Sequence, residues 1–246
     1  MKNIRVTTEG ALQVIRDLGW RPGSVIDIGV AMGTKGLYPV WPDAHICLIE
    51  PSPTGLVYMQ QIAETYPNVH IYNVGASNRN GKFRASTHGK LVNVVMAKPK
   101  PGWTETALPV LTCDHIVKDA RLPPPYLFKL DTDSHEAEVL EGAAETLKQT
   151  DLCIVEVNVF NKFRHRFTPG EMWDAMRRNG FTLLDIAGCG YNPQGLMRTA
   201  DLMFVREDSE LFRIAFDRSA KGDELKARRI RQQDDSVVAN KFIGRQ

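Results

Sequence analysis

A glycine-rich turn follows the first apolar, β-branched run of the sequence. Residues 24–29 read S-V-I-D-I-G, and the chain continues V-A-M-G up to Gly33. Glycines at the carboxyl end of a buried strand let the backbone approach a ligand closely, and the amides that follow can donate to an anionic group. Such a turn favours a nucleotide-like cofactor. The residues predicted to contact it here are Gly29, Ala31, Met32 and Gly33.

Two acids narrow the choice of cofactor. Glu50 ends the next apolar run and follows Asp27 at close to the spacing of about 20 residues at which an acid reaches ribose hydroxyls. Near a pyrophosphate the carboxylate of Asp27 would be repelled, whereas it would attract the ammonium group of S-adenosylmethionine. The turn also lacks the G-x-G-x-x-G pattern of dinucleotide sites. S-adenosylmethionine is therefore favoured over NAD, and the alternative is a strand-to-helix turn that binds no ligand.

A second group of acids follows two later apolar runs. Asp131 ends the run F-K-L-D, which we expect beside the first strand, and His135 lies within one helical turn after it. Glu156 is embedded in an apolar strand, where an acid is costly unless it faces a crevice or a partner. We predict that Asp131, which also borders the cofactor, and Glu156 shape a catalytic site. His135 is the predicted general base, with a water-facing helix residue as the alternative.

Oxygen donors at these strand ends also suit a magnesium ion. Asp131, Glu156 and Asn158 would be its ligands.

Alternating helical and β-type patterns must position these side chains. The order predicts an α/β fold with a doubly wound, mostly parallel sheet. Residues 78–125 are rich in turn signals and prolines, and we predict hairpins and loops inserted at the sheet edge. The predicted helices are 8–18, 55–66, 135–148 and 169–179, and the predicted strands are 24–29, 45–50, 69–74, 126–130, 152–157, 181–186 and 202–205.

Composition restricts the function classes. The 246 residues carry a net charge of +2, so no nucleic-acid partner is expected, and no stretch is long and apolar enough for membrane insertion. The four cysteines lack metal-site spacing, which favours reduced thiols in a cytoplasmic protein. We predict one domain over residues 1–206 and a charged, helical C-terminal extension over 207–246, with residues 224–232 as a solvated helix.

Taken together, the motifs resemble the FkbM-type family of S-adenosylmethionine-dependent methyltransferases. The matching pieces are V-I-D-I-G-V-A-M-G (25–33), I-E-P-S-P (49–53), V-G-A-S-N-R-N-G (74–81), F-K-L-D-T-D-S-H-E-A-E-V-L-E-G-A (128–143) and I-V-E-V-N (154–158). The resemblance implies a class I methyltransferase fold, Rossmann-like, with seven strands of which the last is antiparallel. It also implies methyl transfer to a hydroxyl of a sugar, glycolipid or natural product. Asp131 and Glu136 match the family pattern D-V-Q-G-A-E, whereas Ser134 and His135 depart from it.

On this resemblance, Asp27 and the 29–33 turn hold the methionine part of the cofactor, Glu50 holds the ribose, and Ser77 lies near the adenine. The acceptor would be a small molecule or a glycan, selected by residues 83–125 and 160–170. The run K-F-R-H-R-F at 162–167 alternates cations with aromatics and suits an acidic glycan or a sugar ring. Two alternatives are an NAD-dependent oxidoreductase and a scaffold protein that binds a cofactor without catalysis.

Overall fold

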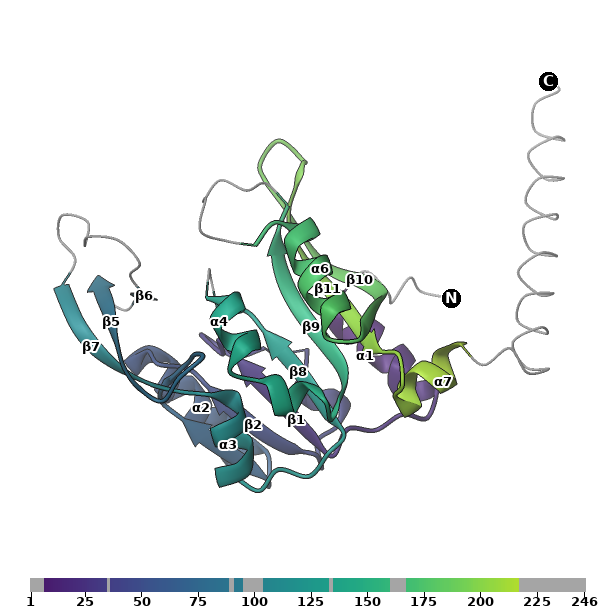
Figure 1. Cartoon of the computed structure of the whole chain (residues 1–246), viewed down its shortest axis with the longest axis horizontal. Helices are drawn as coiled ribbons and strands as arrows, with labels where there is room; N and C mark the ends of the chain where they lie inside the picture. Colours follow the sequence, from purple (N-terminus) through teal and green to yellow (C-terminus); the bar gives the residue numbers. More distant parts are fainter. Residues whose placement is uncertain are drawn as a thin grey trace, which may run out of the picture.

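The structure is a computed structural model that describes residues 7–34, 36–88, 91–94, 104–132, 135–159 and 167–216. Seven strands form its main sheet, in the order β10-β11-β9-β8-β1-β2-β3 (Figure 1). These strands are β1 (Ser24–Ile28), β2 (His45–Ile49), β3 (Val69–Tyr72), β8 (Tyr126–Leu130), β9 (Thr150–Asn158), β10 (Phe181–Tyr191) and β11 (Met197–Arg206).

Strand directions confirm the predicted sheet. The pairs β1–β2, β2–β3, β1–β8 and β8–β9 are parallel, whereas β11 lies antiparallel between β9 and β10. Parallel neighbours require crossover connections, which place helices over both faces of a sheet. β1 is buried along its whole length, as expected for a strand covered on both faces.

Two apolar layers sandwich the sheet. One layer joins Ile26 and Phe128 to four helices, namely α3 (Cys113–Asp119), α4 (Glu136–Glu141), α5 (Ala144–Leu147) and α6 (Pro169–Arg178). The opposite layer joins Val25 and Leu127 to α1 (Thr8–Asp17), the short 3₁₀ helix η2 (Tyr38–Val40), α2 (Pro53–Thr65) and α7 (Glu210–Phe216). Alternation of side chains along each strand divides the core in this way.

The segment predicted to carry hairpins forms a second sheet. Its four strands have the order β4-β7-β5-β6, with bounds Gly75–Ala76 (β4), Gly81–His88 (β5), Leu91–Val94 (β6) and Thr104–Leu111 (β7). β5 pairs antiparallel with both β6 and β7, so hairpin-type pairing is confirmed. Helix α3 was not predicted; the hydroxyl of Thr112 caps it by accepting from the His115 N–H.

The predicted helix 135–148 is interrupted. It divides into α4 and α5 at Gly142, where the backbone passes so close to Ser77 that a Cβ would overlap the Ser77 carbonyl oxygen. The predicted strands 181–186 and 202–205 lie within β10 and β11, which are longer than predicted and pair with each other.

Helix α7 packs against the main sheet. α7 falls within the predicted extension and buries Leu211 in the α1 layer. The predicted helix at 224–232 lies outside the described residues, and the boundary at 206 stays a prediction. Among the helices of the described residues, none is long and apolar enough to cross a membrane.

All four cysteines are free thiols. Cys47, Cys113 and Cys153 are fully buried, whereas Cys189 on β10 is half-buried. Burial raises the pKa of each of the three buried thiols well above the usual range.

Candidate functional site

The carboxyl ends of β1 and β8 meet at Gly29. Its backbone has φ +82°, and a Cβ at this position would overlap the carbonyl oxygen of Asp131. Hydrogen bonds fix the crossing, because the Asp131 N–H donates to the Ile28 carbonyl oxygen at 3.0 Å. The close approach that Gly29 permits is thus to the protein's own strand end. It places Asp131 beside β1, as the sequence predicted.

The turn after β1 keeps a left-handed backbone. Ala31 has φ +47° and Gly33 has φ +92°, and the Gly33 N–H donates to the Val30 carbonyl oxygen at 2.7 Å. Met32 is 66% exposed.

Glu50 is fixed by this turn and by the start of α2. Its Oε2 accepts from the Ala31 N–H at 3.1 Å, and its Oε1 accepts from the Ser52 N–H at 2.8 Å. Gly55 is needed here because a Cβ would overlap the Glu50 side chain. A carboxylate has about four acceptor positions, so each oxygen keeps capacity for a ribose hydroxyl.

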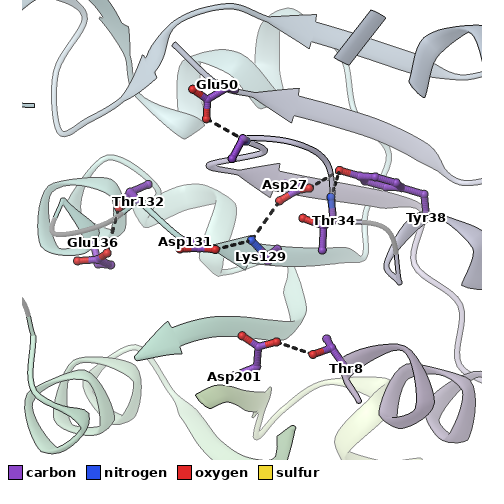
Figure 2. Close-up of polar contacts among 11 residues, drawn as sticks. Thr8, Asp27, Thr34, Tyr38, Glu50, Lys129, Asp131, Thr132, Glu136 and Asp201 are labelled. Atoms are coloured by element: carbon purple, nitrogen blue, oxygen red, sulfur yellow. Dashed lines mark hydrogen bonds and ion pairs between the residues drawn. The ribbon is translucent and has the colours of Figure 1, made fainter. Parts of the chain in front are cut away.

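Asp27 is fully buried and has two partners that the sequence reasoning missed. The Tyr38 hydroxyl donates to its Oδ2, and the Lys129 Nζ lies 3.7 Å from its Oδ1 (Figure 2). Within the described residues, Asp27 Oδ1 accepts no hydrogen bond. Burial raises the pKa of Tyr38, and the Asp27 carboxylate raises it further, so the phenol remains a donor.

Lys129 bridges the two strand ends. Its Nζ lies 3.3 Å from Asp131 Oδ2 as well as near Asp27, and the side chain is buried. Burial alone lowers the pKa of Lys129, but the carboxylates of Asp27 and Asp131 outweigh this effect and leave the pKa raised. The sequence signal for this ion pair was a lysine inside the apolar run F-K-L-D. The same reasoning applies to Glu156, a charged residue inside another apolar strand.

Two further acids face the same side of the sheet as Lys129. Glu156 on β9 is directly opposite Asp201 on β11 in the antiparallel register. The Thr8 hydroxyl, at the start of α1, donates to Asp201 Oδ2 (Figure 2). Asp201 was not predicted as a site residue, because its neighbours come from distant parts of the chain.

The magnesium prediction gains no support. Among the described residues, no three His, Cys, Asp or Glu side chains form a group that could hold a metal ion. Asn158 is in register with Thr199, at the outer end of the β9–β11 pair.

His135 is buried at the start of α4. Its Nε2 lies 3.1 Å from Ser77 Oγ and its Nδ1 lies 3.4 Å from Glu138 Oε2. The ring of Phe83 packs edge-on against the imidazole, with centroids 5.2 Å apart. His135 therefore does not face water, and both ring nitrogens have protein partners. This placement favours a positioning role over the predicted role as general base.

The end of β8 next to Asp131 and the residue Ser77 are the last parts of the predicted site. Thr132 Oγ1 donates to Glu136 Oε1 at 3.3 Å, which ties the end of β8 to the first turn of α4 (Figure 2). Ser77 is fully buried against His135, and its predicted place near an adenine stays a prediction.

The fold and the site define a class of protein. A seven-stranded sheet with β11 inserted antiparallel, a glycine turn after β1 and an acid after β2 are the features of a class I methyltransferase-like domain. The model of the Methyltransferase FkbM domain matches residues 39–183, more than half of the chain. The chain belongs to this family of S-adenosylmethionine-dependent methyltransferases.

Individual relatives are distant. The hexuronic acid methyltransferase AglP of Haloferax volcanii is 23% identical over 146 residues, which cover 54% of this chain and 54% of AglP. The chain thus matches about half the length of that relative. Magnesium protoporphyrin IX methyltransferase from Synechocystis is a similar solved structure, with 12% identity, a TM-score of 0.47, and coverage of 80% of this chain and 76% of that one. Precorrin-6y C5,15-methyltransferase from Geobacter metallireducens has 9% identity and a TM-score of 0.44, with coverage of 83% and 91%.

Proposed function

We propose that this protein transfers the methyl group of S-adenosylmethionine to a hydroxyl oxygen of a sugar, a glycolipid or a related natural product. The observation that carries the proposal is Glu50, whose carboxylate is held by backbone donors of the turn after β1 and of the start of α2. This arrangement orients a carboxylate toward a ribose while the turn offers its backbone to the rest of the cofactor. Membership of the FkbM family supports the same cofactor.

The roles of the residues follow from their positions. The backbone of residues 29–33 and the carboxylate of Asp27 border the methionine part, Glu50 binds the ribose, and Ser77 lies toward the adenine. Lys129 pairs with both Asp27 and Asp131 and holds the two carboxylates in place. When bound, S-adenosylmethionine supplies a methyl group on a positively charged sulfur, which the surplus of carboxylates over Lys129 would favour.

Catalysis then depends mainly on alignment. Methyl transfer is an in-line displacement, so holding the acceptor oxygen in line with the methyl carbon and the sulfur supplies much of the rate. Asp131 and Glu156, at the ends of neighbouring parallel strands, border the space for the acceptor. The buried His135 fixes the start of α4, and Thr132, next to Asp131, donates to Glu136 in the first turn of that helix.

A sugar acceptor is supported by the name of the AglP relative, a hexuronic acid methyltransferase. The cationic and aromatic residues at 162–167, predicted to contact a glycan, lie outside the described residues except for Phe167. The NAD-dependent alternative lacks support from the turn sequence and from the family.

Calorimetric titration tests the cofactor. We expect S-adenosylmethionine and S-adenosylhomocysteine to bind at micromolar concentration, whereas NAD should give no binding heat. Transfer of a labelled methyl group from S-adenosylmethionine to methyl glucoside and methyl glucuronoside then tests the acceptor class. Binding of NAD alone would contradict the proposed function. Binding of S-adenosylmethionine without transfer to either glycoside would contradict a sugar acceptor, and transfer to a nitrogen compound instead would contradict the hydroxyl acceptor.

A further inference from the structure

Three acids form a row across neighbouring strands on one face of the main sheet. Asp131 follows Leu130, which is in register with Val155, and Glu156 follows Val155. Asp201 is directly opposite Glu156. We call Asp131, Glu156 and Asp201 the acceptor-side row.

The three side chains share the face that α1 covers. Leu127 on β8, Ile154 on β9 and Met203 on β11 all belong to the apolar layer on that face. Side chains two positions apart point to the same face of a strand, so Asp131, Glu156 and Asp201 lie on it as well.

Asp201 is held through one of its two carboxylate oxygens. Thr8 is the hydrogen-bond donor that it has among the described residues, and this bond engages Oδ2. Gly188 on the edge strand β10 leaves room for the contact, because a Cβ there would overlap Asp201 Oδ2. The side chain is only partly buried, so Oδ1 retains capacity to accept a proton or a hydrogen bond.

We propose that Asp201 is the proton acceptor of the methyl transfer, a role that rests on the proposed function of the site. As the acceptor oxygen bonds to the methyl carbon, the methyl–sulfur bond breaks and its electron pair stays on sulfur. The hydroxyl O–H bond breaks in the same event, and its proton passes to the Asp201 carboxylate. Asp201 lies beyond residues 39–183, the part of the chain that the family model matches.

The charges around Asp201 suit this role. Facing it are Lys129 and Asp131 from the end of β8, Glu156 from β9 and the hydroxyl of Thr8 from α1. On β10, Ala187 is in register with Asp201, and the nearest acid of that strand, Asp185, accepts from the Ile186 N–H. Burial raises the pKa of Asp201; the Thr8 hydroxyl and Lys129 oppose this and Asp131 adds to it, leaving the pKa above the usual range. A carboxylate with a raised pKa holds a proton better than an ordinary one.

Two variants separate proton transfer from mere anchoring of α1. Asp201→Asn keeps an oxygen for the Thr8 hydroxyl but removes the basic carboxylate, whereas Thr8→Val removes the hydrogen bond and keeps the carboxylate. With methyl glucoside or methyl glucuronoside as the acceptor probe, Asp201→Asn should lower kcat about 100-fold and abolish the loss of kcat at acidic pH. The Kd for S-adenosylmethionine should stay unchanged. Thr8→Val should lower kcat less than about tenfold and keep the acidic loss. Equal losses in the two variants would overturn the proposal.

A second measurement, the titration of the Asp201 carboxyl group in the free protein, needs neither cofactor nor acceptor. In protein with ¹³C-labelled aspartate carboxyl groups, the resonance that Asp201→Asn removes should titrate above the range of ordinary aspartates. A titration within or below that range would overturn the role of Asp201 as proton acceptor. Failure of wild-type protein to bind S-adenosylmethionine would overturn the proposed function and, with it, this role. An ordinary titration of Asp201 in a protein that binds S-adenosylmethionine would overturn the role alone.

Discussion

The two halves of the sheet's carboxyl edge differ in the kind of contact that shapes them: backbone contacts around β1 and β2, and side-chain contacts around β8, β9 and β11. Around β1 and β2, most of these contacts involve the backbone. Gly29 and Gly55 permit close approaches, and the N–H groups of Ala31 and Ser52 donate to the Glu50 carboxylate. Around β8, β9 and β11, side chains make most of the contacts, and the acceptor-side row lies beside the cation of Lys129. A constant cofactor can be bound by a backbone shape, whereas a variable acceptor is selected by side chains.

The largest effect should come from adding one methyl group to the cofactor half. Gly29→Ala places a Cβ onto the Asp131 carbonyl oxygen at a positive φ, so we expect a loss of more than about 4 kcal/mol in the free energy of unfolding. Gly33→Ala is the matched control, because it has a positive φ but only Ile62 Cδ1 nearby, at 3.6 Å. It should cost roughly 1–2 kcal/mol. Urea denaturation measures both, and equal losses would show that strain, not the strand crossing, determines the need for Gly29.

Removing the cation that joins the two halves should have the next largest effect. Lys129→Met leaves Asp27 buried without a positive partner, and we expect a loss of about 3–5 kcal/mol at pH 7. Because the pKa of Lys129 is raised in the folded protein, its contribution to the free energy of unfolding is fully present below the pKa of an unfolded lysine, about 10.4. The contribution is lost as the pH rises through the higher folded-state value.

Urea denaturation of wild type and Lys129→Met between pH 7 and pH 11 follows this difference. The gap between the two proteins should narrow only at the alkaline end. A gap that is constant up to pH 11, or one that narrows near neutral pH, would disagree with a lysine held charged by two carboxylates.

The smallest effect should be on the Kd for S-adenosylmethionine, and it tests whether binding requires the carboxylate of Glu50. Glu50→Gln weakens one charge-assisted contact and should raise the Kd for S-adenosylmethionine about tenfold or more, since such hydrogen bonds contribute about 1.5–3 kcal/mol. Glu64→Gln makes the same chemical change on the exposed face of α2 and should leave the Kd unchanged. Calorimetric titration compares them, and an unaltered Kd in Glu50→Gln would remove the ribose-binding role.

The backbone-built half was the more predictable one. Its glycines, Asp27 and Glu50 lie close together in the sequence, and each strand ends within two residues of its predicted boundary. The strand that ends at Asp131 was predicted beside the first strand, and the pairing of β1 with β8 confirms this.

The side-chain half was less predictable because its contacts are remote. Asp201 and Thr8 are 193 positions apart, and no local pattern marks either as a site residue. The environment of His135 likewise depends on Ser77, which follows β4, and on Phe83 in β5. Lys129 could have been found, because a charged residue inside an apolar strand requires a partner.

The cysteines have a practical consequence for studying this molecule. Three thiols are sealed in the core with raised pKa values, so they resist alkylation, whereas Cys189 on the edge strand β10 is partly accessible. Maleimide dyes and nitroxide spin labels should therefore attach at one position of the folded wild-type chain. That position is next to Gly188, the residue that makes room for Asp201 and Thr8. A single-site optical or magnetic reporter is thus already present in the sequence, at the end of the sheet where we propose that the acceptor binds.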